Sequence, residues 1–391
     1  MAKRAKVGII GAGNISEAYL RLAKVFDNLE VVAIADIVPE AAKARAEQFS
    51  VRAMPVDDLL KDEAIEVVVN LTVPDVHYKV SRSILSAGKH AYSEKPLALN
   101  AKDAGKLVAE AEKRGLKLGC APDTFLGAGA QTARRLIDKG AIGRVIGGTA
   151  YVMSHGMENW HPNPGFFFQP GAGPVFDVGV YYITALVSLL GAVKHVVAMA
   201  SKGFEERLVT SNGPMNGKTI PVDTPTNINA ILTFVSGAQV TLGASWDVWR
   251  HGHPNPIELY GADGTMLIPD PNFFAGKVSY SAKGGDYTEV DSASGPFGTA
   301  NWPWAGPFTR SNYRMLGVAD LVDAVRKGRE PRCSGALGAH VVDIMEAILT
   351  SADERAFVKV KSRVERPAPL GAADARRLSA AVGQAATVAA A

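Results

Sequence analysis

Cysteine is scarce in this sequence: its 391 residues include only two, Cys120 and Cys333. Two cysteines exclude a disulfide framework and a cysteine-rich zinc site. An excess of one charge is also missing, because 42 basic and 39 acidic residues give a formal net charge of +3. With no basic block interleaved with aromatics, this balance excludes a nucleic-acid partner from our expectations.

Membrane signals are missing as well. The apolar run from Val178 to Val193 contains Gly, Ser, Thr and two Tyr and is shorter than a bilayer span. The apolar stretch after the N-terminal MAKRAK is too short for the core of a signal peptide. The composition, 47% hydrophobic and 21% charged, is ordinary for a globular protein. We therefore expect no membrane contact and a cytoplasmic location.

The first third of the sequence alternates strand and helix patterns. Short apolar strand segments occur at 6–10, 31–35, 65–71 and 116–121, with helix patterns between them. Strands separated by helices predict a parallel sheet that is covered on both faces and built from right-handed crossovers. We predict that residues 1–124 form a doubly wound α/β domain of the Rossmann type.

After about residue 125 the pattern changes to strands followed by two helices. The helices are expected near 313–327 and 337–353, and the strand-like segments are 144–155, 195–203, 227–235, 238–248, 256–260 and 265–269. This order predicts an antiparallel sheet with helices on one face, over residues 125–363, followed by an Ala-rich tail at 364–391. The exposed sheet face would need a cover, so we expect a homodimer or homotetramer formed through this sheet.

A glycine-rich turn lies between the first predicted strand and its helix, with the sequence Gly11-Ala12-Gly13-Asn14-Ile15-Ser16. Gly11 permits the tight turn, and Gly13 lets a pyrophosphate approach the helix N-terminus. Asp36 ends the second strand, where it can accept both ribose hydroxyls of an adenosine or merely cap the next helix. No arginine follows it for a 2′-phosphate, so NAD is predicted rather than NADP, with contacts from Gly11, Gly13, Asn14, Ile15 and Asp36.

Two further segments carry candidate catalytic side chains. Ser93-Glu94-Lys95-Pro96 follows a strand at the carboxyl end of the sheet, where open α/β sheets bind their ligands. In the second segment, Asp177 and Tyr181 lie one turn apart on one face if the segment is helical. From these residues alone, a solvated Lys95, a surface Asp177 and a structural Tyr181 remain alternatives.

Together these motifs resemble the glucose–fructose oxidoreductase/inositol dehydrogenase/MocA family. The resemblance covers most of the sequence, through GAGNIS, AIAD, NLTVPDVH, SEKP, GAIG, GAGPVFDVGVYY and GALGAHVVDIMEA. It implies a Rossmann domain followed by a domain with a large, open, mostly antiparallel sheet. It also implies that Lys95, Asp177 and Tyr181 face the nicotinamide, that Thr72 and His77 lie beside its ribose, and that Glu94 contacts the cofactor.

The resemblance and the residue chemistry together predict a hydride-transfer enzyme. Most members of the family have His at the position of Tyr181. The glucose–fructose oxidoreductase and dihydrodiol dehydrogenase branches are similar to this sequence in having Tyr there. Oxidation of a secondary alcohol needs a base for the hydroxyl proton, and a free tyrosine loses its proton only near pH ~10. A neighbouring Lys95 ammonium would stabilise the tyrosinate, and Asp177 would orient the substrate or the lysine. The predicted activity is NAD-dependent oxidation of a secondary alcohol in a sugar, cyclitol or glycoside.

Candidate substrate contacts lie in three places. The loop 153–168 is aromatic and broken by Pro and Gly; in it Trp160 can stack on a sugar ring, while His155 and His161 can form hydrogen bonds. Asp123 begins Asp-Thr-Phe, where many family members carry Asn-Phe-Arg or Asn-Arg-Phe. The third place contains Arg310 and Arg314. These two arginines can be solvated, or they can together hold an anionic group. The histidines match no metal-ligand spacing, so no metal is predicted.

Two other functions stay open. Some enzymes similar to this family use bound NAD to oxidise a glycoside transiently, eliminate the aglycone, add water and re-reduce the product. The aromatic loop around Trp160 and the lack of a carboxylate pair for direct hydrolysis favour such an NAD-dependent glycosidase. The third possibility is a non-catalytic NAD-binding regulator, against which the complete set of Lys95, Asp177 and Tyr181 argues.

Overall fold

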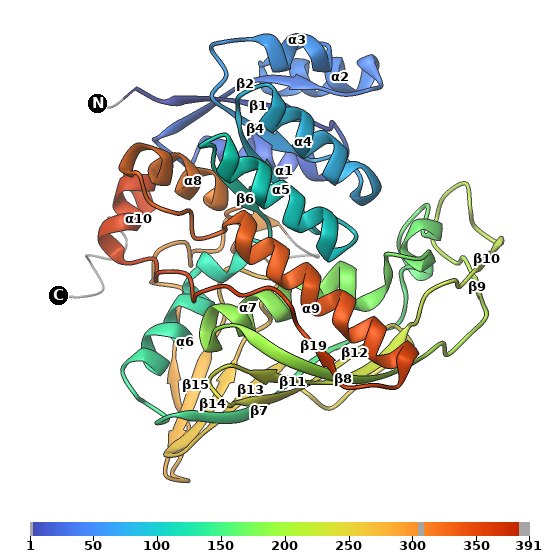
Figure 1. Ribbon diagram of the computed structural model, residues 1–391, viewed down its shortest axis with the longest axis vertical. Coiled ribbons are helices and arrows are strands. Elements are labelled where there is room, and N and C mark those ends of the chain that lie inside the picture. Colours follow the sequence, from blue (N-terminus) through green and yellow to red (C-terminus); the bar gives the residue numbers. More distant parts are fainter. Residues whose placement is uncertain (1–2, 304–308, 383–391) are drawn as a thin grey trace.

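The computed structural model describes residues 3–303 and 309–382. Two large sheets organise this part of the chain, one above the other in Figure 1, with helices between them. A smaller lobe around β9 (Glu206–Leu208) and β10 (Thr219–Pro221) projects to one side. The predicted combination of an α/β sheet and a second, mostly antiparallel sheet is confirmed.

The first sheet has six parallel strands in the order β3-β2-β1-β4-β5-β6. Its strand order reverses between β1 and β4, which places a ligand crevice at their carboxyl ends. The strands are β1 (Ala5–Ile10), β2 (Leu29–Ala35), β3 (Arg52–Ala53), β4 (Val67–Asn70), β5 (His90–Ser93) and β6 (Leu118–Cys120). The connecting helices are α1 (Asn14–Ala23), α2 (Pro39–Phe49), α3 (Val56–Lys61), α4 (His77–Ser86) and α5 (Ala101–Lys113).

The second sheet has nine strands in the order β16-β15-β14-β13-β7-β12-β11-β8-β19. Most neighbours are antiparallel, but β7 and β12 run parallel because α7, β8 and β11 separate them along the chain. The Gly-, Pro- and Ser-rich segment 282–308 contains β16 and also the first strand of a small ribbon, β17 (Trp302–Pro303) with β18 (Thr309–Arg310). Residues 304–308 lie outside the described part. The nine strands are β7 (Val145–Met153), β8 (Val193–Ser201), β11 (Asn227–Phe234), β12 (Gln239–Ser245), β13 (Ile257–Gly261), β14 (Gly264–Ile268), β15 (Val278–Ala282), β16 (Thr288–Val290) and β19 (Val358–Lys359).

Alternating polarity gives this sheet two different faces. On β8, Val196 and Ala198 are buried while Val197 and Met199 are exposed, as period-two burial requires. Helices α6 (Ala128–Asp138), α7 (Val180–Leu190) and α9 (Gly335–Glu354) lie on the buried side (Figure 1). The prediction of helices on one face is confirmed. The other face carries exposed apolar side chains, among them Ile146, Val197, Met199, Ile231 and Tyr260.

Two C-terminal helices return to the first sheet. Helix α8 (Leu316–Lys327) packs beside β6, and the Asn28 amide donates to the Ala319 carbonyl at 2.8 Å. Helix α10 (Ala372–Leu378) packs on α8 with Ala375 and Leu378 buried, so the described part of the Ala-rich tail is docked. The predicted helix near 313–327 exists, and it covers the first sheet rather than the second (Figure 1).

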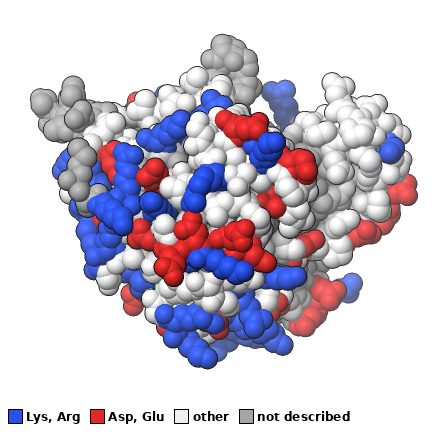
Figure 2. Space-filling model, turned by 90° about the horizontal axis from the view of Figure 1, so that it is seen from above, with Lys and Arg blue, Asp and Glu red and all other residues white. Residues whose placement is uncertain are grey.

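Helix α9 is long and apolar enough to cross a membrane by length and composition, but 67% of its apolar window is buried inside the protein. It contacts α5, α7 and β8, as the core helix of a globular protein does. On the face seen from above, basic and acidic side chains lie among one another (Figure 2).

Candidate active site

The glycine turn after β1 has room for a ligand on one side only. Gly11 has φ +111°, and a Cβ there would lie 2.5 Å from the Leu71 carbonyl oxygen. A Cβ on Gly13 would meet no atom within 4 Å, so the space above the α1 N-terminus is open. Ser16 is fully buried beneath the turn, and its hydroxyl donates to the Gly13 carbonyl at 2.6 Å. This geometry fits a pyrophosphate at the helix N-terminus.

Asp36 closes the same site from the end of β2. Its Oδ2 accepts the Ala12 amide at 2.7 Å and its Oδ1 accepts the Val38 amide at 2.9 Å. Each oxygen keeps a lone pair for a ribose hydroxyl, so both the ligand role and the capping role are compatible with one position. Ile37 beside it is 92% exposed, which leaves an apolar surface where an adenine would lie.

Thr72 and His77 are held at the carboxyl end of β4 by Asn70. The buried Asn70 side chain accepts the Thr72 hydroxyl at 2.6 Å and donates to the His77 carbonyl at 3.1 Å. The His77 ring lies between two carbonyl oxygens, 2.7 Å from that of Pro96 and 2.9 Å from that of Thr72. Burial lowers the pKa of His77 despite these contacts. The histidine therefore fixes the Thr72 and Pro96 loops and is itself enclosed.

Lys95 and the α7 segment meet over the crevice. The Lys95 ammonium donates to Asp177 Oδ1 at 2.9 Å and to the Asp177 carbonyl at 2.6 Å, and it lies 5.2 Å from the Tyr181 ring centroid. Burial acts to lower the pKa of Lys95, but the neighbouring Asp177, Tyr181 and Glu94 outweigh it and raise the pKa. The predicted cluster of Lys95, Asp177 and Tyr181 is thus assembled in space.

The Asp177 segment is wound more loosely than predicted. Residues Val175–Gly179 form a π-helical turn that continues into α7, so Asp177 lies on the wide turn and Tyr181 lies in the first turn of α7. A Cβ on Gly179 would lie 3.2 Å from the Pro174 carbonyl oxygen, which explains the glycine inside the helix. The Tyr181 side chain is buried, but its hydroxyl has no hydrogen bond within the described residues and is not fully enclosed. That oxygen is therefore available to a substrate.

Glu94 is oriented from the opposite side by a residue that the sequence analysis did not single out. The Tyr19 hydroxyl donates to Glu94 Oε1 at 2.8 Å, and the Lys95 amide donates to Glu94 Oε2 at 2.9 Å. Burial, reinforced by Glu94 and Asp123, raises the pKa of Tyr19 well above its usual value. Tyr19 therefore stays protonated and acts as a donor.

Asp123 and the two arginines occupy different surroundings. Asp123 is buried, its Oδ2 accepts the Gly317 amide at 3.0 Å, and burial is the main cause that raises its pKa to about 6. Arg314 is half-buried and its charge interacts with Tyr181, Glu94 and Asp123. Arg310 is exposed and lies 3.9 Å over the Phe273 ring. Joint anion binding by the two arginines stays a prediction.

The aromatic loop after β7 is held by buried charges. The Arg207 guanidinium donates to Glu158 Oε1 at 2.7 Å and also pairs with Asp247, and all three side chains are largely buried. His155 stacks on Trp249 with centroids 3.5 Å apart, and its Nε2 lies 3.4 Å from Glu158 Oε1. This arrangement makes His155 part of the loop's support.

Trp160 and His161 stand on the outer side of that support. Trp160 is 61% exposed, and its ring contacts the His161 ring edge-on at 5.5 Å. The His161 carbonyl accepts the Ser211 hydroxyl at 2.6 Å, so the β9–β10 lobe carries the loop. Most of the Trp160 side chain is open to solvent, so it does not pack under its own loop.

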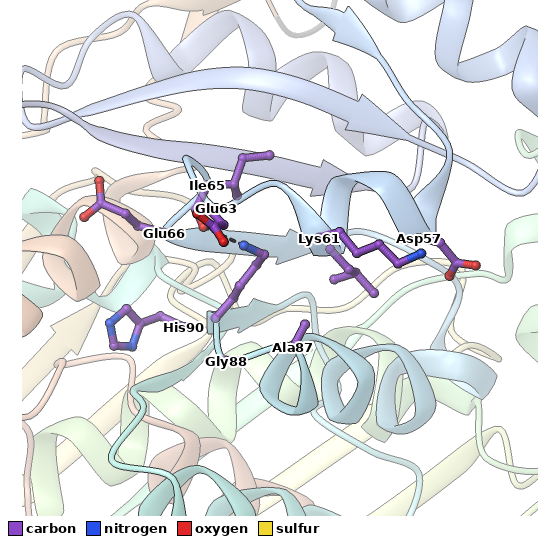
Figure 3. Close-up of a pocket in the computed structure, with 10 residues that line it drawn as sticks. Asp57, Lys61, Glu63, Ile65, Glu66, Ala87, Gly88 and His90 are labelled. Carbon is purple, nitrogen blue, oxygen red and sulfur yellow. Dashed lines mark hydrogen bonds between the residues drawn. The ribbon is translucent and has the colours of Figure 1, made fainter.

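A cavity lies at the amino ends of the strands of the first sheet, opposite the candidate site. It has a volume of about 800 Å³, and its lining includes Lys61, Glu63, Glu66 and His90 near the amino ends of β4 and β5 (Figure 3). The Lys89 ammonium that borders it donates to the Asp62 and Ile65 carbonyls at 2.7 and 2.9 Å. Ligands of open α/β sheets bind at the carboxyl ends, so this cavity is separate from the candidate site. Within the described residues no group of three or more His, Cys, Asp or Glu is placed to hold a metal ion.

A parallel sheet with this glycine turn, a strand-ending aspartate and a Lys–Asp–Tyr cluster at its carboxyl edge defines an NAD-binding oxidoreductase. Comparison with known families agrees. The model described as "Oxidoreductase family, NAD-binding Rossmann fold" matches residues 5–121, and the GFO/IDH/MocA C-terminal domain matches residues 130–267. The chain belongs to the Gfo/Idh/MocA oxidoreductase family, which confirms the resemblance and the NAD prediction.

The individual relatives share limited sequence identity with this chain. Levoglucosan dehydrogenase of Pseudarthrobacter phenanthrenivorans is 24% identical over 90% of this chain and 97% of its own. Inositol 2-dehydrogenase/D-chiro-inositol 3-dehydrogenase of Lactiplantibacillus plantarum is 35% identical, over 36% of this chain and 42% of its own. The solved structure of levoglucosan dehydrogenase in complex with NADH and levoglucosan has a TM-score of 0.77 at 22% identity, covering 92% of this chain and 99% of that one. The fold is therefore shared along nearly the whole chain.

Proposed function

We propose that this enzyme oxidises a secondary alcohol of a sugar, cyclitol or glycoside with NAD, using Tyr181 as the proton acceptor. The observation that carries the proposal is the cluster in which Lys95, paired with Asp177, lies over the ring of a Tyr181 whose hydroxyl is accessible. Relatives named for levoglucosan and inositol support the substrate class.

Each side chain of the site has its own role in the proposed reaction. When bound, NAD supplies the acceptor for the hydride that leaves the alcohol carbon. Tyr181 takes the hydroxyl proton, Asp177 fixes the Lys95 ammonium, and Glu94 and Thr72 hold the cofactor side of the crevice. Substrate contacts are proposed for the accessible face of Trp160. They are also proposed for the polar side chains of His155, His161, Asp123, Asp177, Arg310 and Arg314.

A polyol screen tests this proposal. The purified enzyme is incubated with NAD and with levoglucosan, myo-inositol and D-apiose in turn at alkaline pH, and NADH absorbance is followed. Turnover of at least one secondary alcohol is expected. If NAD binds, as measured by calorimetry, yet no alcohol in a broad sugar and cyclitol panel yields NADH, the dehydrogenase proposal is wrong.

The redox-neutral glycosidase is the second candidate. It is favoured by the exposed aromatic surface of Trp160 and Phe166, which offers an apolar contact for an aglycone. Its signature is release of nitrophenol from aryl glycosides that requires NAD but accumulates no NADH. Accumulation of NADH in step with alcohol oxidation, without nitrophenol release, favours the dehydrogenase instead.

Assembly through the open face of the nine-stranded sheet is also proposed, in a homodimer or homotetramer. Its support is the row of exposed apolar side chains that includes Val197, Met199 and Ile231. Light scattering of the native protein and of Met199→Glu tests it, with a smaller particle expected for the variant. A monomeric native protein would contradict the proposal. A cytoplasmic location stays a prediction.

A further inference from the structure

Tyr19 lies on the face of α1 that supports the nucleotide turn. Ser16 precedes it by one helical turn on the same face, and the Ser16 hydroxyl donates to the Gly13 carbonyl at 2.6 Å. Both side chains are fully buried, and the Tyr19 hydroxyl donates to Glu94 Oε1 at 2.8 Å. One helix face therefore contacts both the turn that fits a pyrophosphate and the loop that carries Lys95.

The Glu94 carboxylate connects Tyr19 to the main chain of Lys95. The Glu94 amide donates to the Asn70 carbonyl at 2.8 Å, which fixes the main chain of Glu94 at the end of β4. Glu94 Oε2 accepts the Lys95 amide at 2.9 Å, and within the described residues the carboxylate's other hydrogen bond is the one from Tyr19. Glu94 is buried. Removal of the Tyr19 hydroxyl therefore leaves Oε1 without its donor and frees the carboxylate to rotate away from the Lys95 amide.

The contacts of the Lys95 ammonium depend on where its main chain lies, because a long, flexible stem joins the two. The ammonium donates to Asp177 Oδ1 at 2.9 Å and to the Asp177 carbonyl at 2.6 Å. It also lies 5.2 Å from the centroid of the Tyr181 ring. A shift of the Lys95 amide would disturb all three contacts, and a displacement of about 1 Å in an active site can lower the rate by about 10²-fold.

We propose that Tyr19 is a positioning residue, which fixes the main chain of Lys95 through Glu94. The lysine is thereby held on Asp177 beside the ring of Tyr181. The inference rests on the proposed function, which gives Lys95 and Tyr181 their roles in proton transfer. In this arrangement the N-terminus of α1 faces the pyrophosphate site, and the side of the same helix aligns the proton-transfer residues. A purely structural Tyr19 would contribute to folding and leave the turnover of the folded enzyme unchanged.

Tyr19→Phe removes the donor and keeps the buried ring. At saturating NAD, its kcat for an alcohol that the native enzyme oxidises is expected to fall by about 10- to 10²-fold, while KM and the Kd for NAD change far less. The matched control is Tyr313→Phe, which removes the hydrogen bond of another buried tyrosine, to the Thr299 carbonyl at 3.1 Å, and should keep the native kcat. In the Lys95→Met background, Tyr19→Phe should cause no further loss, because it acts through Lys95.

Chemical acetylation followed by mass spectrometry reports the state of Lys95 without an alcohol substrate. With NAD at the same saturating concentration throughout, Lys95 should react slowly in the native protein, because Asp177 holds its ammonium, and several-fold faster in Tyr19→Phe. Lys89 is the internal control for loosening of the whole fold, since it is buried at the opposite end of the sheet and donates to two main-chain carbonyls. Glu94→Gln breaks the same link a second way, because it replaces one of the two acceptor oxygens by a donor, and it should also expose Lys95.

Lower kcat together with faster labelling of Lys95, at unchanged labelling of Lys89, supports the proposal. Native kcat and native Lys95 labelling in a folded Tyr19→Phe variant overturn it. A multiplicative loss in the Lys95→Met background also overturns it, because Tyr19 would then act independently of the lysine. If Tyr19→Phe does not fold, slow labelling of Lys95 in Glu94→Gln counts against the proposal. If the native enzyme oxidises no alcohol, the proposed function is wrong, and the labelling alone decides whether Tyr19 positions Lys95.

Discussion

Lys95 and Asp177, 82 residues apart in the sequence, are joined twice by one ammonium group: Nζ donates to Oδ1 at 2.9 Å and to the main-chain carbonyl at 2.6 Å. The pair connects the loop after β5 of the first sheet to the π-helical turn that begins α7. Side chain and main chain of the α7 segment are therefore oriented by a residue of the nucleotide-binding sheet.

Lys95→Met should lower kcat by about 10²–10⁴-fold, because Asp177 loses its partner and the proton transfer loses its orientation. The affinity for NAD should change far less, since the glycine turn and Asp36 stay intact. Steady-state kinetics and calorimetry check both parts. A variant that loses NAD binding in proportion to activity would place Lys95 in cofactor binding alone.

Tyr181→Phe removes one hydroxyl and keeps the buried ring. Turnover should fall by about 10²–10⁴-fold at unchanged NAD affinity if this oxygen accepts the proton. Combined with Lys95→Met, the loss should be less than the product of the single losses, because both residues serve one proton transfer. Multiplicative losses in the double variant would show that the two act in separate steps.

Alanine substitutions at the two glycines of the turn should have different effects. Gly11→Ala is strained by φ +111° and by the Leu71 carbonyl 2.5 Å from the new Cβ, so its melting temperature should fall. Gly13→Ala meets no protein atom within 4 Å and should fold normally, but its methyl group occupies the space proposed for the pyrophosphate. Thermal denaturation and NAD titration of both variants check this; tight NAD binding by Gly13→Ala would relocate the cofactor.

Stability should depend on pH through Asp123. Burial raises its pKa in the folded state to about 6 from 3.8, so the folded protein holds this proton more tightly than the unfolded chain. The free energy of unfolding contributed by this group is therefore greatest below the unfolded value and falls as pH rises through the folded one. Asp123→Asn should exceed the native protein in stability by on the order of 1–3 kcal/mol at about pH 7.5, and by little near about pH 4. Urea denaturation at both pH values checks it; a variant less stable at the higher pH contradicts the assignment.

Arg207→Met should destabilise the lobe by about 3–5 kcal/mol, because Glu158 and Asp247 would be left buried and unpaired. Lys277→Met breaks an exposed pair with Glu289 and is the matched control, with an expected cost of about 0–1 kcal/mol. Denaturant unfolding compares the two. Equal, small losses would mean that the buried pair contributes little to the lobe.

The parts of the site that could be predicted are those with a local signal. The Gly11–Gly13 turn follows an apolar strand, Asp36 ends the next one, and Asp177 and Tyr181 share a helical spacing. The residues that position these side chains have no local signal in the sequence. Tyr19 reaches Glu94 across 75 residues, and Arg207 reaches Glu158 across 49, through single contacts that no periodicity or motif records.

The placement of α8 shows the same limit. Its amphipathic pattern predicts a helix near the right residues, but the pattern is equally compatible with either sheet as the surface it covers. Its position is set by long-range contacts, such as the Asn28 amide on the Ala319 carbonyl, 291 residues away. A periodic pattern predicts that one face of a helix is buried, but it does not identify the element that covers this face.

The hydrogen bond between Asp123 and Gly317 has a consequence for dissecting this enzyme. It brings the place where the chain leaves the first sheet within 3.0 Å of the place where α8 begins, although 194 residues separate them. A fragment cut at residue 124 would lack the helix that covers β6 and would expose its apolar edge to water. A short linker from this point straight into α8 bridges almost no distance. A miniature nucleotide-binding module should therefore be built by splicing these two ends, and the excised sheet could be exchanged as a cassette between them.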